Sequence, residues 1–77
     1  MIISGLVIDV APDAGASALA ALQRRSWVAR VEGPVSPGRL VAVVTAEDNS
    51  ALDALMDDML TTPGIIGVSP AFIHFDA

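Results

Sequence analysis

Hydrophobic and polar positions follow two different periods along the chain, and their order predicts four strands and two helices. Apolar runs with a two-residue alternation predict strands over residues 2–10, 27–32, 39–46 and 65–75. The strand over 27–32 is expected to alternate without interruption. Its two faces are then formed by Trp27, Ala29 and Val31 on one side and by Val28, Arg30 and Glu32 on the other.

Turn-forming residues indicate how these strands are connected. Glycine, proline and serine dominate residues 33–38, which predicts a hairpin with a longer connection between the second and third strands. Pro70 lies inside the last predicted strand. Since proline cannot donate a hydrogen bond to a sheet, we expect this strand at a sheet edge or at a bulge.

Between the strands, apolar side chains recur every three or four residues, as in an amphipathic helix. The clearer stripe follows the candidate N-caps Asp48, Asn49 and Ser50 and consists of Leu52, Leu55, Met56, Met59 and Leu60. The weaker stripe consists of Ala14, Ala18, Leu19 and Leu22. We expect Asp13 to be the N-cap of this first helix, and Arg24 and Arg25 to lie in its last turn.

The predicted order is β-α-β-β-α-β within one domain, residues 1–77. Right-handed crossovers place both helices on the same face of a four-stranded antiparallel sheet. The fold class is therefore α+β, a ferredoxin-like sandwich, with the first and third strands in the middle of the sheet. The other face of the sheet has no helix on it.

The third strand is apolar on both of its faces, because Thr45 is the only polar residue from Leu40 to Ala46. A strand with one bare face normally alternates between apolar and polar residues. We expect the side of Leu40, Ala42 and Val44 to meet the helices, since Asp9 and Arg39 then point to solvent. The bare face is then formed by Ile3, Gly5, Val7, Val41, Val43 and Thr45.

The opposite orientation would expose Leu6, Ile8, Leu40 and Val44 instead. Either orientation leaves an uncharged apolar patch in the middle of the sheet. Such a patch usually marks a site where a partner binds. The hydrophobic fraction of 53%, high for a chain of this size, supports this interpretation.

Charge and cysteine content narrow the classes of partner. Nine acidic residues stand against four arginines, giving a net charge of −5, which argues against nucleic acid as a ligand. The chain has no cysteine and therefore no thiolate metal site. Its first residues lack the basic segment of a secretory signal, and no apolar run has the length of a membrane span. We expect a cytoplasmic protein that does not insert into membranes.

Candidate catalytic side chains are few. His74 is the only histidine and has no second ligand at metal-binding spacing, so we expect it on a surface or an edge strand. The serines have no base nearby in the sequence, and Gly5 lacks the glycine spacing of a phosphate loop. Asp53, Asp57 and Asp58 are expected on a solvated helix face. The sequence therefore predicts no catalytic residue, no metal and no cofactor: the protein is not expected to be an enzyme.

Three segments carry a resemblance to a known family: ISGLVI from residue 3, GRLVAVVTAED from residue 38 and PGIIGVSPAFI from residue 63. In their order and spacing they resemble the NapD family, over essentially the whole chain. The resemblance implies a small cytoplasmic chaperone for assembly of the periplasmic nitrate reductase. Such a chaperone binds the twin-arginine signal peptide of the catalytic subunit, NapA, and restrains its export until the molybdenum cofactor is inserted.

The bare face supplies the residues that we expect to bind this peptide. Its arginine pair would meet carboxylates at the rim, and its apolar stretch would lie on the middle of the sheet. The expected peptide-binding residues are Ile3, Gly5, Val7, Asp9, Glu32, Val41, Val43 and Thr45. Because the patch is apolar, weak homodimerisation is expected in the free protein.

Two other classes of function fit the same fold. An ACT-like regulatory module would dimerise through its sheet and bind a small metabolite. An acylphosphatase-like enzyme would need an arginine on a phosphate loop with an asparagine nearby, and Asn49 is the only asparagine, at a predicted helix start.

Overall fold

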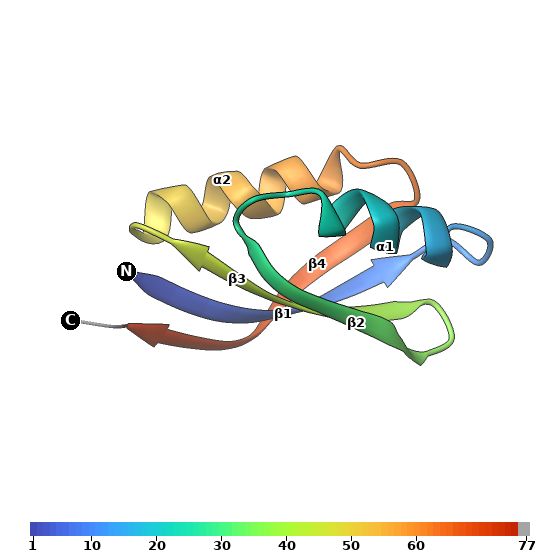
Figure 1. Ribbon diagram of the computed structural model, residues 1–77, viewed down its shortest axis with the longest axis horizontal. Helices are drawn as coiled ribbons and strands as arrows, with labels where there is room; N and C mark the ends of the chain where they lie inside the picture. Colours follow the sequence, from blue (N-terminus) through green and yellow to red (C-terminus); the bar gives the residue numbers. More distant parts are fainter. Residues whose placement is uncertain (76–77) are drawn as a thin grey trace.

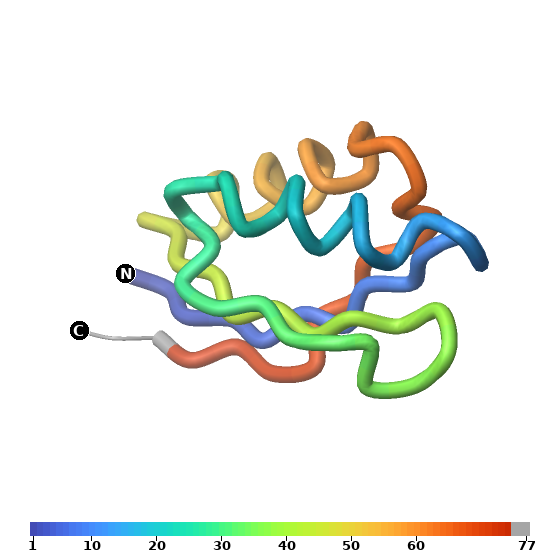
Figure 2. Tube along the Cα trace, turned by 45° about the vertical axis from the view of Figure 1, so that its right-hand side comes forward, coloured from blue at the N-terminus to red at the C-terminus, as the bar shows by residue number. Residues whose placement is uncertain are grey.

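The structure is a computed structural model of the chain and describes residues 1–75. Its elements follow the predicted order, and their bounds are β1 (Ile2–Val10), α1 (Gly15–Gln23), β2 (Val28–Ser36), β3 (Arg39–Ala46), α2 (Asn49–Leu60) and β4 (Ile65–Phe75). The two helices lie side by side on one face of the sheet, so the molecule has two layers (Figures 1 and 2). This arrangement confirms the predicted ferredoxin-like α+β fold.

The sheet is antiparallel with strand order β2-β3-β1-β4, which confirms that the first and third strands are central. β1 and β3 pair without a shift, from Ile2 opposite Ala46 to Asp9 opposite Arg39. β2 and β4 are the two edge strands. The predicted edge position of the proline-containing strand β4 is therefore confirmed.

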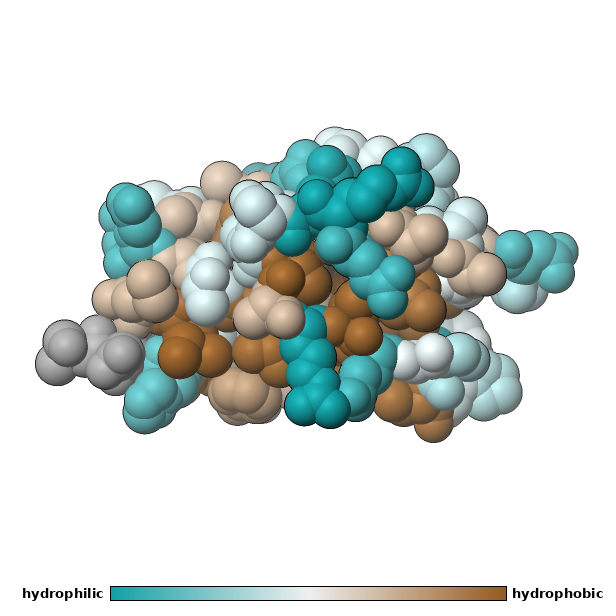
Figure 3. Space-filling view, in the orientation of Figure 1, coloured by the Kyte–Doolittle hydropathy of each residue, from teal (hydrophilic) through white to brown (hydrophobic). Residues whose placement is uncertain are grey.

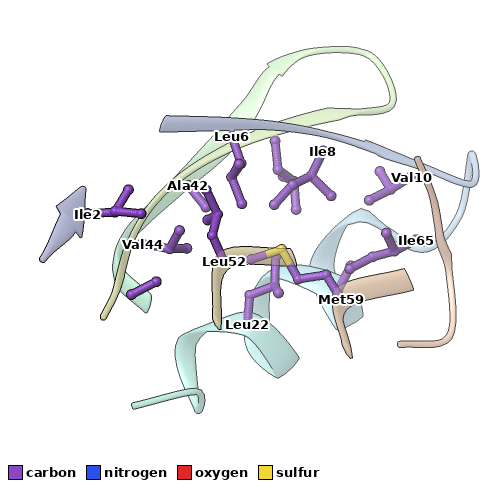
Figure 4. Close-up of a cluster of buried hydrophobic side chains, with 13 residues drawn as sticks. Ile2, Leu6, Ile8, Val10, Leu22, Ala42, Val44, Leu52, Met59 and Ile65 are labelled. Atoms are coloured by element: carbon purple, nitrogen blue, oxygen red, sulfur yellow. The ribbon is translucent and has the colours of Figure 1, made fainter. Parts of the chain in front are cut away.

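The core lies between the sheet and the two helices. Leu40, Ala42 and Val44 of β3 have no exposed surface, and neither have Leu6 and Ile8 of β1. Figure 4 shows that side chains from these strands point toward Leu22 of α1 and toward Leu52 and Met59 of α2. The predicted orientation of β3 is confirmed, because its other face, with Val41, Val43 and Thr45, stays partly exposed.

The first helix begins later and ends earlier than its capping residues suggested. Asp13 lies in a turn in which the Ala14 amide donates to the Ala11 carbonyl at 3.0 Å, so the N-cap is Ala14, without a side-chain cap. The helix ends at Gln23, and Arg24 is its C-cap rather than part of its last turn. Arg24 Nε still donates to the Ala20 carbonyl at 3.3 Å, which satisfies one of the carbonyls at this end.

The sequence pattern predicted that strand β2 alternates without interruption, but the structure shows an interruption. Val28 lies opposite Val44 and Arg30 opposite the next residue of β3, Val43, so Ala29 is an extra residue in a β-bulge. The bulge brings Val28 to the same side as Val31, and both pack against the core. The prediction that Val28 shares a face with Arg30 was therefore wrong.

The connection between β2 and β3 is also tighter than predicted. β2 continues to Ser36, which lies opposite Arg39, so only Pro37 and Gly38 form the turn. Gly38 has φ +75°, and a proline followed by a glycine with positive φ is typical of a type II turn. The turn-forming composition of residues 33–38 concealed the extra length of the strand.

The second helix confirms Asp48 as an N-cap, since its Oδ1 accepts a hydrogen bond from the Ala51 amide at 2.8 Å. Leu52 and Met59 are buried in the core, but Leu60 is 48% exposed at the end of the helix, contrary to the predicted stripe. Arg25 joins the ends of the two helices: its Nη2 donates to Thr62 Oγ1 at 3.3 Å, and its Nε lies 3.5 Å from Asp58 Oδ2. Neither helix of the described chain has the length and hydropathy of a membrane span.

Replacement of Asp48 tests the contribution of the observed cap. We expect Asp48→Ala to lower the free energy of unfolding by about 1 kcal/mol, because the Ala51 amide loses its acceptor. Asp13→Ala is the matched control and should change this free energy by less than about 0.5 kcal/mol. Urea unfolding of both variants measures the difference, and equal losses would contradict the assignment of the cap.

Candidate functional site

The candidate site is the sheet face opposite the helices, which we call the open face. Residues that are directly opposite on neighbouring strands point to the same side of a sheet. The pairing therefore arranges the open face in rows across β2, β3, β1 and β4. One row is Arg30, Val43, Gly5 and Phe72; the next is Glu32, Val41, Val7 and Ser69. Beyond them Arg39 lies opposite Asp9, and on the other side Thr45 lies opposite Ile3.

The middle of the open face is apolar and remains accessible. Ile3, Val7, Val41 and Val43 are partly exposed, although their immediate neighbours in each strand are buried. Figure 3, seen from the side on which β2 lies, shows hydrophobic surface along the sheet layer, interrupted by hydrophilic side chains, and a more hydrophilic, mixed surface over the helices. The structure thus brings together Ile3, Val7, Val41 and Val43 on one uncovered surface, whereas Gly5, which was also predicted on the bare face, is buried. Their role in peptide binding stays a prediction.

Phe72 of β4 adds an aromatic side chain that the sequence pattern did not identify. It lies opposite Gly5, and its ring covers the glycine so closely that a Cβ atom built on Gly5 would be 2.2 Å from Phe72 Cε1. Phe72 as a whole residue is nevertheless 52% exposed. A glycine in a central strand often marks such a close approach. Gly5 therefore serves the packing of the Phe72 ring, and it is buried beneath that ring rather than exposed on the open face.

Ser4, next to Gly5, faces the other side of the sheet and is fully buried. Its Oγ donates to the Phe72 carbonyl at 2.8 Å, next to the point where the pairing of β1 with β4 shifts between Gly5 and Leu6. This hydrogen bond fixes the backbone of the residue whose ring lies on the open face. Ser4 is therefore a structural residue and lies outside the candidate site.

The two carboxylates predicted at the rim lie on the open face, but each is held by an arginine of the same chain. Arg39 Nε donates to Asp9 Oδ1 at 3.1 Å. Arg30 donates through Nε and Nη2 to Glu32 Oε1, and the Nε distance is 2.8 Å. The contact between Arg30 and Glu32 could be predicted from the sequence, since residues two apart in a strand share a face. The pairing of Asp9 with Arg39 depends on the register of β1 and β3, which the sequence does not specify.

In these pairs the charges of the carboxylates and guanidinium groups of the sheet balance each other. Its four strands carry two carboxylates, two guanidinium groups and His74. The acidic excess of the chain therefore lies outside the strands, for example on Asp53 and Asp57, which are exposed on α2. A basic ligand on the open face meets carboxylates that are locally compensated, rather than an acidic surface.

The candidate catalytic and metal-ligating side chains of residues 1–75 can be located relative to the open face. His74 is exposed on the edge strand β4, opposite Ile3, as expected. Among the described residues, no group of three or more His, Cys, Asp or Glu side chains is arranged to hold a metal ion. A hollow of about 260 Å³ lies at the β2 edge, lined by Gln23 and residues 28–31, and so away from the apolar middle of the face.

Comparisons with known proteins give a family and a fold. The family model described as NapD protein matches residues 1–77. TTHA0845 from Thermus thermophilus has a crystal structure that covers 100% of this chain and 96% of its own, at 24% identity and a TM-score of 0.85. The solution structure of the E. coli Tat proofreading chaperone protein NapD covers 97% of this chain and 78% of its own, at 23% identity and a TM-score of 0.71. No curated protein matches in sequence.

The contact between Gly5 and Phe72 can be tested by adding a single methyl group. We expect Gly5→Ala to fold but to push the Phe72 ring away from β1, because the new Cβ takes the space of the ring edge and the exposed ring can move outward. The measurement is the loss of nuclear Overhauser effects between the ring of Phe72 and residue 5. Gly15→Ala is the control, since a Cβ there meets nothing within 4 Å. Retained contacts in Gly5→Ala would contradict the observed geometry.

Proposed function

The chain belongs to the NapD family, and from this premise we propose that it is a cytoplasmic Tat proofreading chaperone for the periplasmic nitrate reductase. In this role it binds the twin-arginine leader of the catalytic subunit NapA and restrains export until the cofactor has been inserted. The function is binding rather than catalysis. The relative from E. coli is itself described as a Tat proofreading chaperone.

The observation that carries the proposal is the uncovered apolar middle of the open face. A twin-arginine leader combines a basic pair with an apolar stretch. Val7, Val41 and Val43 offer the apolar stretch a contact surface, and burial of apolar area contributes about 25 cal/mol per Å². Asp9 and Glu32 lie next to this surface and supply the acceptors for the basic pair.

Restraint of export follows from mass action. A leader whose arginines and apolar stretch are covered by the chaperone cannot present them to the export machinery at the same time. At a chaperone concentration about 100 times Kd, the free leader is reduced to about 1%, which corresponds to about 2.7 kcal/mol. The chaperone needs no chemical step for this effect, only an affinity that matches its concentration.

Titration with a synthetic NapA leader tests the proposed function. We expect amide chemical-shift changes concentrated on β1 and β3, since these strands form the middle of the open face. A complex with a Kd of about 10 μM, or about 7 kcal/mol, is mostly saturated at about 100 μM peptide. A scrambled peptide of the same composition is the control and should cause no saturable shifts.

One result of this titration would contradict the proposal. Absence of any shift at about 100 μM leader would exclude a complex with a Kd of about 10 μM or tighter.

Sedimentation should also show weak self-association of the free protein, which the leader competes away because both use the open face. A dimer that persists at saturating leader would instead support the ACT-like regulatory module.

Val43→Asp tests whether the apolar middle is the contact surface. An aspartate at this position must lose its hydration when the leader covers it, so we expect binding to weaken by a factor of about 10 or more. The fold should survive because Val43 points away from the core. Ala20→Asp is the control: it adds the same charge at an exposed position of α1, in the other layer.

The readouts are the Kd for the leader and the far-UV circular dichroism of both variants. Native dichroism with unchanged affinity in Val43→Asp would exclude the middle of the open face as the site. The acidic face of α2 would then become the better candidate, because Asp53 and Asp57 are exposed there.

A further inference from the structure

We infer that Arg30 and Arg39 compete with the arginine pair of the leader for the carboxylates of the open face, and that this competition limits the affinity. The inference rests on the proposed function and adds to it the residues that tune the affinity. It assigns a role to two side chains that neither contribute to the core nor belong to the apolar contact surface.

The first observation is that, within residues 1–75, the strands place no carboxylate on the open face that lacks an arginine partner. Asp9 and Glu32 are the only carboxylates on the four strands, and each accepts a hydrogen bond from a resident arginine. Arg30 and Glu32 are two residues apart along β2, whereas Arg39 reaches Asp9 across the pairing of β3 with β1. An incoming guanidinium group therefore finds both acceptors already engaged.

The second observation concerns position. Arg30 lies in the same row as Val43, and Glu32 in the same row as Val41. Asp9 and Arg39 face each other two residues further along their strands from Val7 and Val41. Both ion pairs thus border the apolar surface directly, and a leader whose apolar stretch lies on that surface brings its arginines to these pairs.

A carboxylate cannot serve two guanidinium groups without cost. Arg39 contacts one oxygen of Asp9, Oδ1, and Arg30 contacts one oxygen of Glu32, Oε1. If the leader used the second oxygen, two like charges would lie a few ångströms apart and repel each other. If it displaced the resident arginine, that arginine would lose its partner. In both cases the resident side chain lowers the affinity.

The exchange is feasible because both pairs are accessible to water. The side chains of Arg39 and Asp9 are 52% and 42% exposed, and those of Arg30 and Glu32 are 71% and 57% exposed. Ion pairs at such exposure are weak and open readily. Replacement of one guanidinium group by another also leaves the number of charge pairs on the face unchanged. The affinity then depends mainly on the apolar stretch, and the leader can be released again.

The test compares three variants that each remove one positive charge. Arg30→Gln and Arg39→Gln free the carboxylates of the open face. Arg24→Gln removes the same charge at the end of α1, in the helix layer, where Nε donates only to the Ala20 carbonyl. Isothermal titration with the NapA leader should show about two- to fivefold tighter binding for Arg30→Gln and Arg39→Gln, as expected from the strength of an exposed pair. Arg24→Gln should bind as the unmodified protein does.

Two further arms establish the cause. A leader in which both arginines are replaced by glutamine should bind all variants equally, because it does not need the carboxylates. Arg39→Gln should also give no gain when Asp9 is already replaced by Asn, since the negative charge that attracts the leader is then absent; this forms a double-mutant cycle. Urea unfolding midpoints of all variants should stay unchanged, given the exposure of the pairs.

Unchanged or weaker binding by both Arg30→Gln and Arg39→Gln would overturn the inference while leaving the proposed function intact. An equal gain in Arg24→Gln would also overturn it, because the effect would then come from net charge alone. If neither the unmodified protein nor any folded variant binds the leader, the proposed function fails and this inference fails with it.

Discussion

Two helices can cover only one face of a four-stranded sheet, and most properties of this molecule follow from that constraint. A helix with its side chains is about 10–12 Å wide, so α1 and α2 together match the width of one sheet face and leave nothing for the other. The core is therefore supplied by alternate residues of β1 and β3, such as Leu6 and Leu40. The residues between them are also largely apolar, yet stay on the surface. An apolar residue retained in such a position is most simply explained by a partner.

Several elements could be predicted because their signal is local. β1, β3 and β4 keep the predicted bounds, and Asp48 caps α2 through its own side chain. The orientation of β3 was also predictable, because one orientation alone puts Asp9 and Arg39 in water. In each case the relevant residues lie within one element, or the choice has only two outcomes.

Other features depend on contacts between segments that are distant in the sequence. The bulge at Ala29 reverses the side to which Val28 points, and only the pairing with β3 reveals it. The Phe72 ring covers Gly5, and Arg39 bonds to Asp9, through pairings between strands that are far apart along the chain. The alternation of residues along the strands placed the apolar and acidic residues of the candidate site on one face. It could not show that each acidic side chain is already paired with an arginine. The register of the sheet decides that point.

The irregular edge strands determine how this sheet can hold another chain. An edge with regular backbone pairing accepts almost any extended peptide, since every residue offers the same amide and carbonyl groups. Here β2 contains the bulge at Ala29 and a proline at position 34, and β4 contains Pro70 and two shifts of register. Such interruptions make both edges poor templates for strand addition. If the open face binds the leader as proposed, recognition is thereby left to its side chains, and we expect a partner to be selected by its sequence rather than by its backbone.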